Sequence, residues 1–549
     1  MMRMRRFYGV LLVGISGWFM SEANACTSLL AGRKATADGS TLITYAADSH
    51  TLYGSLVYLP AGEYPAGAML DVKEWDTGKP LGQIPQARST YAVMGNMNEH
   101  QLAITESTWG GRPELVDTTG ILDYGSLIYI SLQRARTARE AIKVMTDLVK
   151  KYGYYSSGES FSIADPDEVW VLEMIGKGPH NRGAVWVAVR IPDDCISAHA
   201  NQARIHTFPL DDKENCLYSP DVISFAREKG YFSGLNKDFS FADAYAPADF
   251  GALRGCEARV WAFFRKYHPA MDDYLPYLNG ESAAPIPLYV KPDRKLSVQD
   301  MKDAMRDHFE DTPFDMTQDI GAGPFKAPYR FRPMSFAVDG VEYTQERAIA
   351  TQQTGFTLVA QMRNWLPDAI GGVLWFGVDD ANTCVYIPIY CCATEVPECF
   401  SPDNGSLYRF SWTSAFWIHN WVANMAYARY NFMIRDIRPV QQQLETEFNT
   451  WQPLIEKSAA EMYRNDRAAA VRFLTSYSIS QAQRSTARWK ELGEYLLVKY
   501  LDGNVKREKD GKFLENEYGL PEDPEFPGYS EEYYRAVAKD AGERLRVKF

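Results

Sequence analysis

The chain has 549 residues, of which 46% are hydrophobic, 23% charged and 13% aromatic, a composition typical of a folded globular protein and not of a disordered or fibrous one. Its formal net charge of -12 argues against a nucleic-acid-binding protein, which would need a basic surface to contact phosphates. After residue 25 the sequence has no apolar run of the ~18 residues that a membrane span requires, so no stable span is expected.

Residues 1–25 have the features of a secretory signal. Three arginines precede an apolar stretch at residues 7–20, and residues 23–25 form the small-residue cleavage sequence Ala-Asn-Ala. We therefore expect export to the periplasm or beyond the cell, with a mature chain that begins at Cys26. Two alternatives stay open, namely a retained membrane anchor and lipidation of the new terminal cysteine.

Seven further cysteines follow Cys26, and none of them shows CxxC or metal-ligand spacing. Exported proteins often contain disulfides, but an odd number leaves at least one of these cysteines unpaired or intermolecular. The group at residues 384–399 is interpreted as core thiols or local bridges and not as a metal site. The connectivity cannot be deduced from the sequence.

Strands and turns dominate residues 26–110. Short apolar runs flank the turn signal Asp38-Gly39, and two more flank the polar segment NMNEH at residues 96–100. Thr137 then begins the sequence T-A-R-E, a capping-box pattern, and apolar residues recur at helical spacing until Gly153. This pattern predicts a helix between Thr137 and Gly153.

Strand patterns return in FSIA, EVWVLEMI, GAVWVAVRI and CISAHA, and again in GFTLVAQM, GGVLWFGV and CVYIPIY. Between these two groups, Ser297 begins S-V-Q-D, which predicts a second capped helix. After about residue 405 the periodicity becomes that of long helices. We expect an α+β domain at residues 26–404 and a helical extension at 405–549 that packs on it.

A cysteine at the start of a mature chain can carry acyl-transfer chemistry. Its thiol has a pKa near ~8.5 and needs a base, and the terminal α-amine of the same residue, with a pKa of about 7.7–8.0, can serve as one. Removal of residues 1–25 would therefore create nucleophile and base together at Cys26.

Asp48 is the candidate partner of that amine. If the turn at Asp38-Gly39 closes a hairpin, Asp48 returns close to Cys26, where its carboxylate could hold the amine in place. A register slip of one residue would point the side chain to the opposite face. The alternative is a solvent-facing carboxylate at the end of a strand.

Five segments then resemble the dipeptidase A family, which are cysteine peptidases of the N-terminal-nucleophile hydrolase superfamily. They are CTSLLAGRKATADGSTLITYAADS, NMNEHQLAITES, IADPDEVWVLEMIGKG, GAVWVAVRIPD and ISAHANQARI. The resemblance implies an αββα four-layer sandwich of two antiparallel sheets between helices, here with the helical extension. It also implies hydrolysis of dipeptides or short peptides without a cofactor or metal. No cofactor motif is present in the sequence.

By the same resemblance, Cys26 is the nucleophile and Asp48 orients its amine. Asn98 and Asn201 match amides on the oxyanion side of the site, and Arg259 matches a distal arginine less closely. Each asparagine also has a structural alternative, Asn98 as a turn residue and Asn201 as a cap of backbone groups.

Two substrate-binding candidates complete the prediction. Related enzymes often carry an arginine shortly before the matched aspartate, whereas the sequence T-Y-A-A-D-S offers Tyr45 there, so the thiol lacks that source of positive charge. Glu106 follows a predicted strand and could contact a charged substrate group or pair in solvent.

The favoured function is an exported cysteine dipeptidase. One alternative is an acylase for linear amides, similar to penicillin V and bile-salt acylases, and a second is a surface binding protein without turnover. The oligomeric state is not predicted.

Overall fold

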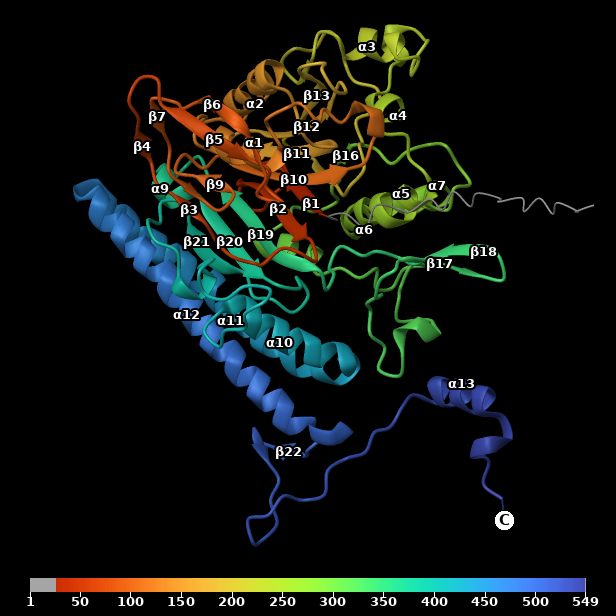
Figure 1. Ribbon diagram of the computed structural model, residues 1–549. Helices are drawn as coiled ribbons and strands as arrows, with labels where there is room; N and C mark the ends of the chain where they lie inside the picture. The colour runs from red at the N-terminus through yellow and green to blue at the C-terminus, as the bar shows by residue number, and fades with distance from the viewer. Residues whose placement is uncertain (1–25, 549) are drawn as a thin grey trace, which may run out of the picture.

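The computed structural model describes residues 26–548, so the predicted signal segment lies outside the described residues. Within this range, antiparallel strands form two large sheets, and long helices follow near the C-terminus (Figure 1). The strand-rich first part and the helical last part therefore agree with the sequence patterns.

The first sheet has seven strands in the described residues. Their order is β16 (Tyr289–Val290), β14 (Ile196–His199), β1 (Ser28–Ala31), β2 (Thr41–Asp48), β19 (Thr354–Met362), β20 (Val373–Val378) and β21 (Ile387–Tyr390). Because β1 and β2 are central, the segment that contains Cys26 enters the middle of this sheet.

The second sheet has eight strands in the same range. Their order is β15 (Cys216–Tyr218), β13 (Ala184–Ile191), β12 (Val169–Gly176), β11 (Gly158–Ala164), β10 (Ala103–Trp109), β9 (Met97–Asn98), β8 (Val93–Met94) and β3 (Tyr58–Leu59). Strands β10 and β11 contact β2 of the first sheet. Short two-stranded ribbons are formed by β4 (Gly62–Glu63) with β7 (Ser89–Thr90), β5 (Met69–Lys73) with β6 (Pro80–Pro85), β17 (Ser335–Val338) with β18 (Val341–Thr344), and β22 (Glu508–Lys509) with β23 (Lys512–Phe513).

Helices α1 (Tyr124–Leu132) and α2 (Ala138–Tyr152) pack on the second sheet through a separate apolar cluster. Thr137 caps α2 by accepting a hydrogen bond from the Glu140 amide, and Gly153 ends it with a φ of 79° that favours glycine. The predicted helix is confirmed. Glu140 bonds the Arg136 amide instead of the cap residue, so the reciprocal capping box is not formed.

Helices α6 (Ala258–Tyr267), α8 (Val298–Ala304), α10 (Ala415–Ala428) and α12 (Arg467–Lys499) contact the first sheet, as does α11 (Tyr430–Asn465). The predicted cap at Ser297 is confirmed, with a full capping box to Asp300. The remaining helices are α3 (Val222–Glu228), α4 (Phe241–Tyr245), α5 (Phe250–Ala252), α7 (Leu275–Leu278), α9 (Asp368–Gly371) and α13 (Glu531–Ala541).

The helical C-terminal region begins at Ala415, close to the predicted change of pattern, and α12 packs along β21. The division of the chain at residue 404 stays a prediction. Among residues 26–548, no helix is both long and apolar enough to cross a bilayer. Every cysteine in this range is a free thiol, and the group at residues 384–399 lies mostly in the core.

Candidate active site

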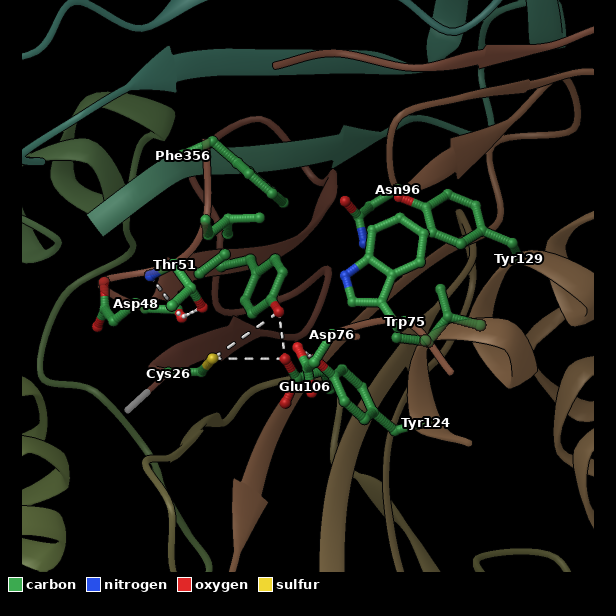
Figure 2. A pocket seen from close by; sticks show the side chains of 16 residues that line it. Cys26, Asp48, Thr51, Trp75, Asp76, Asn96, Glu106, Tyr124, Tyr129 and Phe356 are labelled. Atoms are coloured by element: carbon green, nitrogen blue, oxygen red, sulfur yellow. Dashed lines mark hydrogen bonds between the residues drawn. The ribbon is translucent and has the colours of Figure 1, made fainter. Parts of the chain in front are cut away.

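A cavity of about 240 Å³ lies beside Cys26, and we call it the Cys26 cavity (Figure 2). Strand β2 and the loop after it form one wall, Glu106 of β10 forms a second, and the first turns of α1 form a third. Trp75 and Asp76 approach from the ribbon that contains β5. The cavity thus lies where both sheets meet α1.

Arg259, in the first turn of α6, fixes the backbone of Cys26. One guanidinium nitrogen donates to the Cys26 carbonyl oxygen at 2.7 Å and to the Thr27 hydroxyl at 2.7 Å. The other nitrogen donates to the Ala200 carbonyl at 3.0 Å and to the Asn201 side-chain oxygen at 2.9 Å. Since this arginine is buried and makes charge-assisted hydrogen bonds, it holds the first described residue in one position.

The Cys26 sulfur faces two side chains in the cavity. Its thiol donates to Oε1 of Glu106 at 3.4 Å and lies 3.8 Å from the Tyr45 hydroxyl, which donates to the same oxygen. Burial raises the pKa of the Cys26 thiol well above its usual range, and the charges of Glu106 and Asp48 raise it further. The resting thiol therefore keeps its proton and needs a base to become a nucleophile.

Asp48 is fully buried and lines the Cys26 cavity. Its carboxylate forms an ion pair with Arg347 and accepts a hydrogen bond of 2.6 Å from Thr354. Burial raises the pKa of Asp48, whereas Arg347 and Thr354 oppose that rise. The positive charge of Arg347 thus compensates the Asp48 carboxylate and not the Cys26 sulfur.

The predicted pairing of Cys26 with Asp48 is wrong by one residue. Strands β1 and β2 pair Leu30 with Ile43, and the same register continues to the bridge between Thr27 and Ala46, which sets Cys26 opposite residue 47. The two strands are not joined by a tight turn at Asp38-Gly39. In the segment between them, the amides of residues 34 and 35 donate to the carbonyl oxygen of Asp193. Asp48 nevertheless lies in the Cys26 cavity.

Comparison with known proteins assigns the chain to a family. The family model described as peptidase family C69 matches residues 53–443, which is well over half of the chain. The chain belongs to peptidase family C69. The matched residues begin after Cys26. The resemblance to the dipeptidase A family of cysteine peptidases is confirmed.

Curated relatives of this C69 peptidase are named as dipeptidases. A "Probable dipeptidase" of Salmonella dublin is 27% identical over 70% of this chain and 83% of its own length. "Dipeptidase A" of Lactobacillus helveticus is 26% identical over 74% of this chain and 82% of its own. A "Probable dipeptidase B" of Streptococcus pyogenes serotype M1 is 22% identical over 91% and 97%. The similarity therefore extends over most of the C69 chain and marks it as a hydrolase of the cysteine-peptidase class.

The structure does not place Asn98 on the wall of the Cys26 cavity. Its amide donates to the carbonyls of Leu132 and Ala135 at 2.8 Å, and its oxygen accepts from the amides of His100 and Leu102. The oxygen thus holds the turn between β9 and β10, and the nitrogen ties this turn to the end of α1 and the residues after it. The oxyanion role inferred for Asn98 by resemblance is not supported, whereas the alternative turn role fits these contacts.

Asn201 lies beside Cys26 through their shared contact with Arg259. Its amide nitrogen donates to the Thr108 carbonyl at 2.5 Å, and its φ of 60° bends the chain after β14. Tyr45 and Glu106, the two predicted substrate-binding residues, both line the cavity. Arg259, the least specific match in the sequence, hydrogen-bonds both the Cys26 carbonyl and the Asn201 side chain.

Several residues of the site were not predicted from the sequence. Arg347 and Thr354 flank the start of β19, some 300 positions from Asp48, and no local pattern marks them. Asn96 lines the cavity two residues before the asparagine that the resemblance selected, and its amide bonds the Ile104 carbonyl at 3.0 Å. The motif NMNEH thus indicated the correct turn, but not which amide reaches the cavity.

Proposed function

We propose that this chain is an exported cysteine dipeptidase whose nucleophile is the terminal Cys26 formed by removal of residues 1–25. The observation that carries the proposal is the position of the Cys26 sulfur, which faces a cavity of about 240 Å³ while Arg259 clamps the carbonyl of the same residue. The names of the curated relatives support the substrate class.

The architecture supports the same proposal. Contacts between β2 and both β10 and β11 join the two sheets, with α1 and α2 on one side and α6, α8 and α12 on the other. We propose that these layers are the αββα sandwich of N-terminal-nucleophile hydrolases. In this arrangement Cys26, just before the central strand β1, faces substrate in the Cys26 cavity between the two sheets and α1.

The α-amine is proposed as the base because the described wall of the cavity contains no histidine or lysine. The nearby His199 is held between the hydroxyls of Ser107 and Ser162, and burial lowers its pKa to about 3. A neutral histidine with both nitrogens occupied cannot collect the thiol proton. The amine of Cys26 lies on the same residue as the sulfur and titrates near neutral pH.

The reaction follows in two stages. The amine of Cys26 accepts the thiol proton, the sulfur attacks the carbonyl carbon, and the ammonium returns that proton to the departing amine as the peptide C–N bond breaks. Water then gives a proton to the same amine and adds to the thioester, which releases the acid and restores the thiol. Asp48 is proposed to orient the amine. The oxyanion role expected of Asn201 by resemblance would require its amide to turn away from the Thr108 carbonyl, to which it donates.

The size of the cavity favours short substrates. Sites for drug-sized ligands usually have ~300–1,000 Å³, and the Cys26 cavity, at about 240 Å³, is smaller. A dipeptide is thus a better match than a long folded chain.

Paired cysteine variants test the proposal. Cys26→Ala is expected to abolish dipeptide hydrolysis, and Cys26→Ser to leave little, because a hydroxyl ionises far less readily than a thiol. Cys195→Ala removes another buried free thiol outside the cavity and is expected to keep full activity. Near-native hydrolysis by Cys26→Ala would refute the nucleophile.

A substrate panel separates this function from its alternatives. Faster cleavage of free-amino dipeptides than of N-acylated amides supports a dipeptidase, whereas the opposite preference supports an acylase. A chain that binds peptides but shows no Cys26-dependent hydrolysis of any amide would be a binding protein.

A further inference from the structure

Glu106 shares its end of the Cys26 cavity with a second buried carboxyl group. In the pairing of β10 with β11, Thr108 lies opposite Glu159, so Glu106 and Glu159 lie on the same face, one step apart on the diagonal. Glu106 is 1% exposed and lines the cavity, whereas Glu159 is fully buried behind it and accepts a hydrogen bond of 2.9 Å from Thr108.

These two carboxyl groups lack a compensating cation. Within residues 26–548, neither glutamate forms an ion pair with a lysine, arginine or histidine, and each leaves one buried oxygen, Oε2 of Glu106 and Oε1 of Glu159, without a hydrogen-bond partner. Two other buried carboxylates, Asp48 and Glu445, do have one, in Arg347 and Arg306. Since an uncompensated buried charge is costly, a cation that enters the cavity would stabilise the ionised form of Glu106.

Burial raises the pKa of both carboxyl groups of this pair. For Glu159 the rise is well above its usual range, and the adjacent Glu106 charge raises it further. For Glu106, hydrogen bonds from Tyr45 and Cys26 oppose the rise. Glu159 is therefore the partner that more readily keeps a proton for Glu106, and Glu106, on the cavity wall, is the partner that more readily carries the negative charge.

Glu106 has room for one more donor. A carboxylate offers about four acceptor positions. Tyr45 and Cys26 occupy two of them, both on Oε1, and a protonated Glu159 would take a third. Figure 2 shows the contact between Cys26 and Glu106 at the cavity wall. The Tyr45 hydroxyl donates to the same Glu106 oxygen. The cysteine contact also ends when the thiol loses its proton, because a thiolate no longer donates.

The distance between Glu106 and the sulfur defines which cation fits. In an α-amino acyl group the nitrogen lies about 2.5 Å from the carbonyl carbon, from the standard bond lengths and angle. Attack requires that carbon at about 3–3.5 Å from the sulfur. An ammonium hydrogen-bonded to Oε1 of Glu106, itself 3.4 Å from the sulfur, satisfies both conditions.

We infer that Glu106, backed by Glu159, is the subsite for the α-ammonium group of the substrate, so that the enzyme releases the first residue of peptides with a free amino terminus. The inference rests on the proposed function of Cys26. Asp48 is not assigned this role because Arg347 already compensates its charge and the proposed function assigns it to the amine of Cys26. Glu159 is a positioning residue that acts through Glu106.

Equilibrium binding tests the subsite independently of turnover. On a Cys26→Ala background, calorimetry measures the affinity for a free-amino dipeptide and for its des-amino analogue. Adding Glu106→Gln is expected to weaken dipeptide binding at least about 100-fold and to change des-amino binding less than threefold. Glu173→Gln, a buried glutamate on β12 that bonds backbone amides away from the cavity, is the matched control and should change neither affinity.

Glu159 is tested on the same background by rescue. Glu159→Leu removes the donor to Glu106 and is expected to weaken binding of the free-amino dipeptide about tenfold or more, and Glu159→Gln, which keeps an N–H donor, should restore most of it. A purely structural role would instead weaken both peptides equally in both variants.

Three results would overturn the inference. They are equal dipeptide affinity with and without Glu106→Gln, equal loss for both peptides, and failure of Glu159→Gln to rescue. A Cys26→Ala protein that binds neither peptide would instead reject the dipeptide substrate itself, and the subsite with it.

Discussion

The ion pair between Arg347 and Asp48 provides a quantitative test of the site electrostatics. Asp48 is fully buried, and Arg347 supplies its compensating charge, so Arg347→Met leaves a buried carboxylate without its cation. Loss of one partner of a buried ion pair costs about 3–5 kcal/mol. We expect the free energy of unfolding at pH 7 to fall by that amount.

The penalty has a defined dependence on pH. The pKa of folded Asp48 is already raised by burial, and loss of Arg347 raises it further, whereas in the unfolded chain it stays near about 3.9. The deficit relative to the wild type therefore develops as pH rises from the folded pKa of Asp48 in the wild type toward its higher folded pKa in the variant. Below pH ~4 the carboxyl is protonated in both states, and the penalty shrinks toward about 1 kcal/mol for the lost hydrogen bonds.

Urea denaturation of the wild type and Arg347→Met at several pH values measures this difference. Arg363→Met is the matched control, since Arg363 forms a buried bidentate pair with Glu456 of α11, away from the cavity. Both variants should lose similar stability at pH 7, but only Arg347→Met should lower kcat/KM. A penalty below about 1 kcal/mol at pH 7, or one that does not change with pH, would refute the electrostatic reasoning.

Three further variants test other contacts. Asn98→Ala leaves two buried carbonyls and two buried amides without their partner, so it should cost about 2–4 kcal/mol in urea unfolding and leave kcat/KM of the folded enzyme unchanged; a specific loss of kcat would restore its catalytic role. Arg259→Lys cannot reach Cys26 and Asn201 together, so kcat should fall at least about tenfold, and an unchanged kcat would contradict the clamp. The pKa of His199 is lowered to about 3, so the folded chain loses stability as pH falls below the unfolded value of about 6.5. His199→Gln should make unfolding free energy less dependent on pH between 6 and 4 by about 1.4 kcal/mol per pH unit, and an unaltered slope would refute a neutral buried histidine.

Local patterns predicted the features that depend on neighbouring residues. The caps at Thr137 and Ser297 and the stop at Gly153 follow from side chain to backbone hydrogen bonds within a few positions, and all three are present. The proximity of Cys26 and Asp48 required only a returning strand. Its register was wrong because loop contacts with Asp193, far along the chain, determine where the hairpin closes.

Features that depend on distant packing could not be read in this way. Arg347 reaches Asp48 from the segment before β19. Glu159 lies near Glu106 because β11 pairs with β10 in the second sheet. Asn98 shows a different limit, because a motif match identifies a residue type and a turn, but the direction of a side chain is decided by the carbonyls that surround it. The electrostatics of the site thus required the full structure.

The chemical state of the first residue of the active enzyme is the most direct test of the account. Active protein would be labelled with iodoacetamide until activity is lost, and mass spectrometry would then identify its N-terminal peptide. We predict a peptide that begins at Cys26 with a free α-amine and one alkyl group on its sulfur, in proportion to lost activity. Turnover by protein that retains residues 1–25, or that has a blocked amine, would contradict the mechanism.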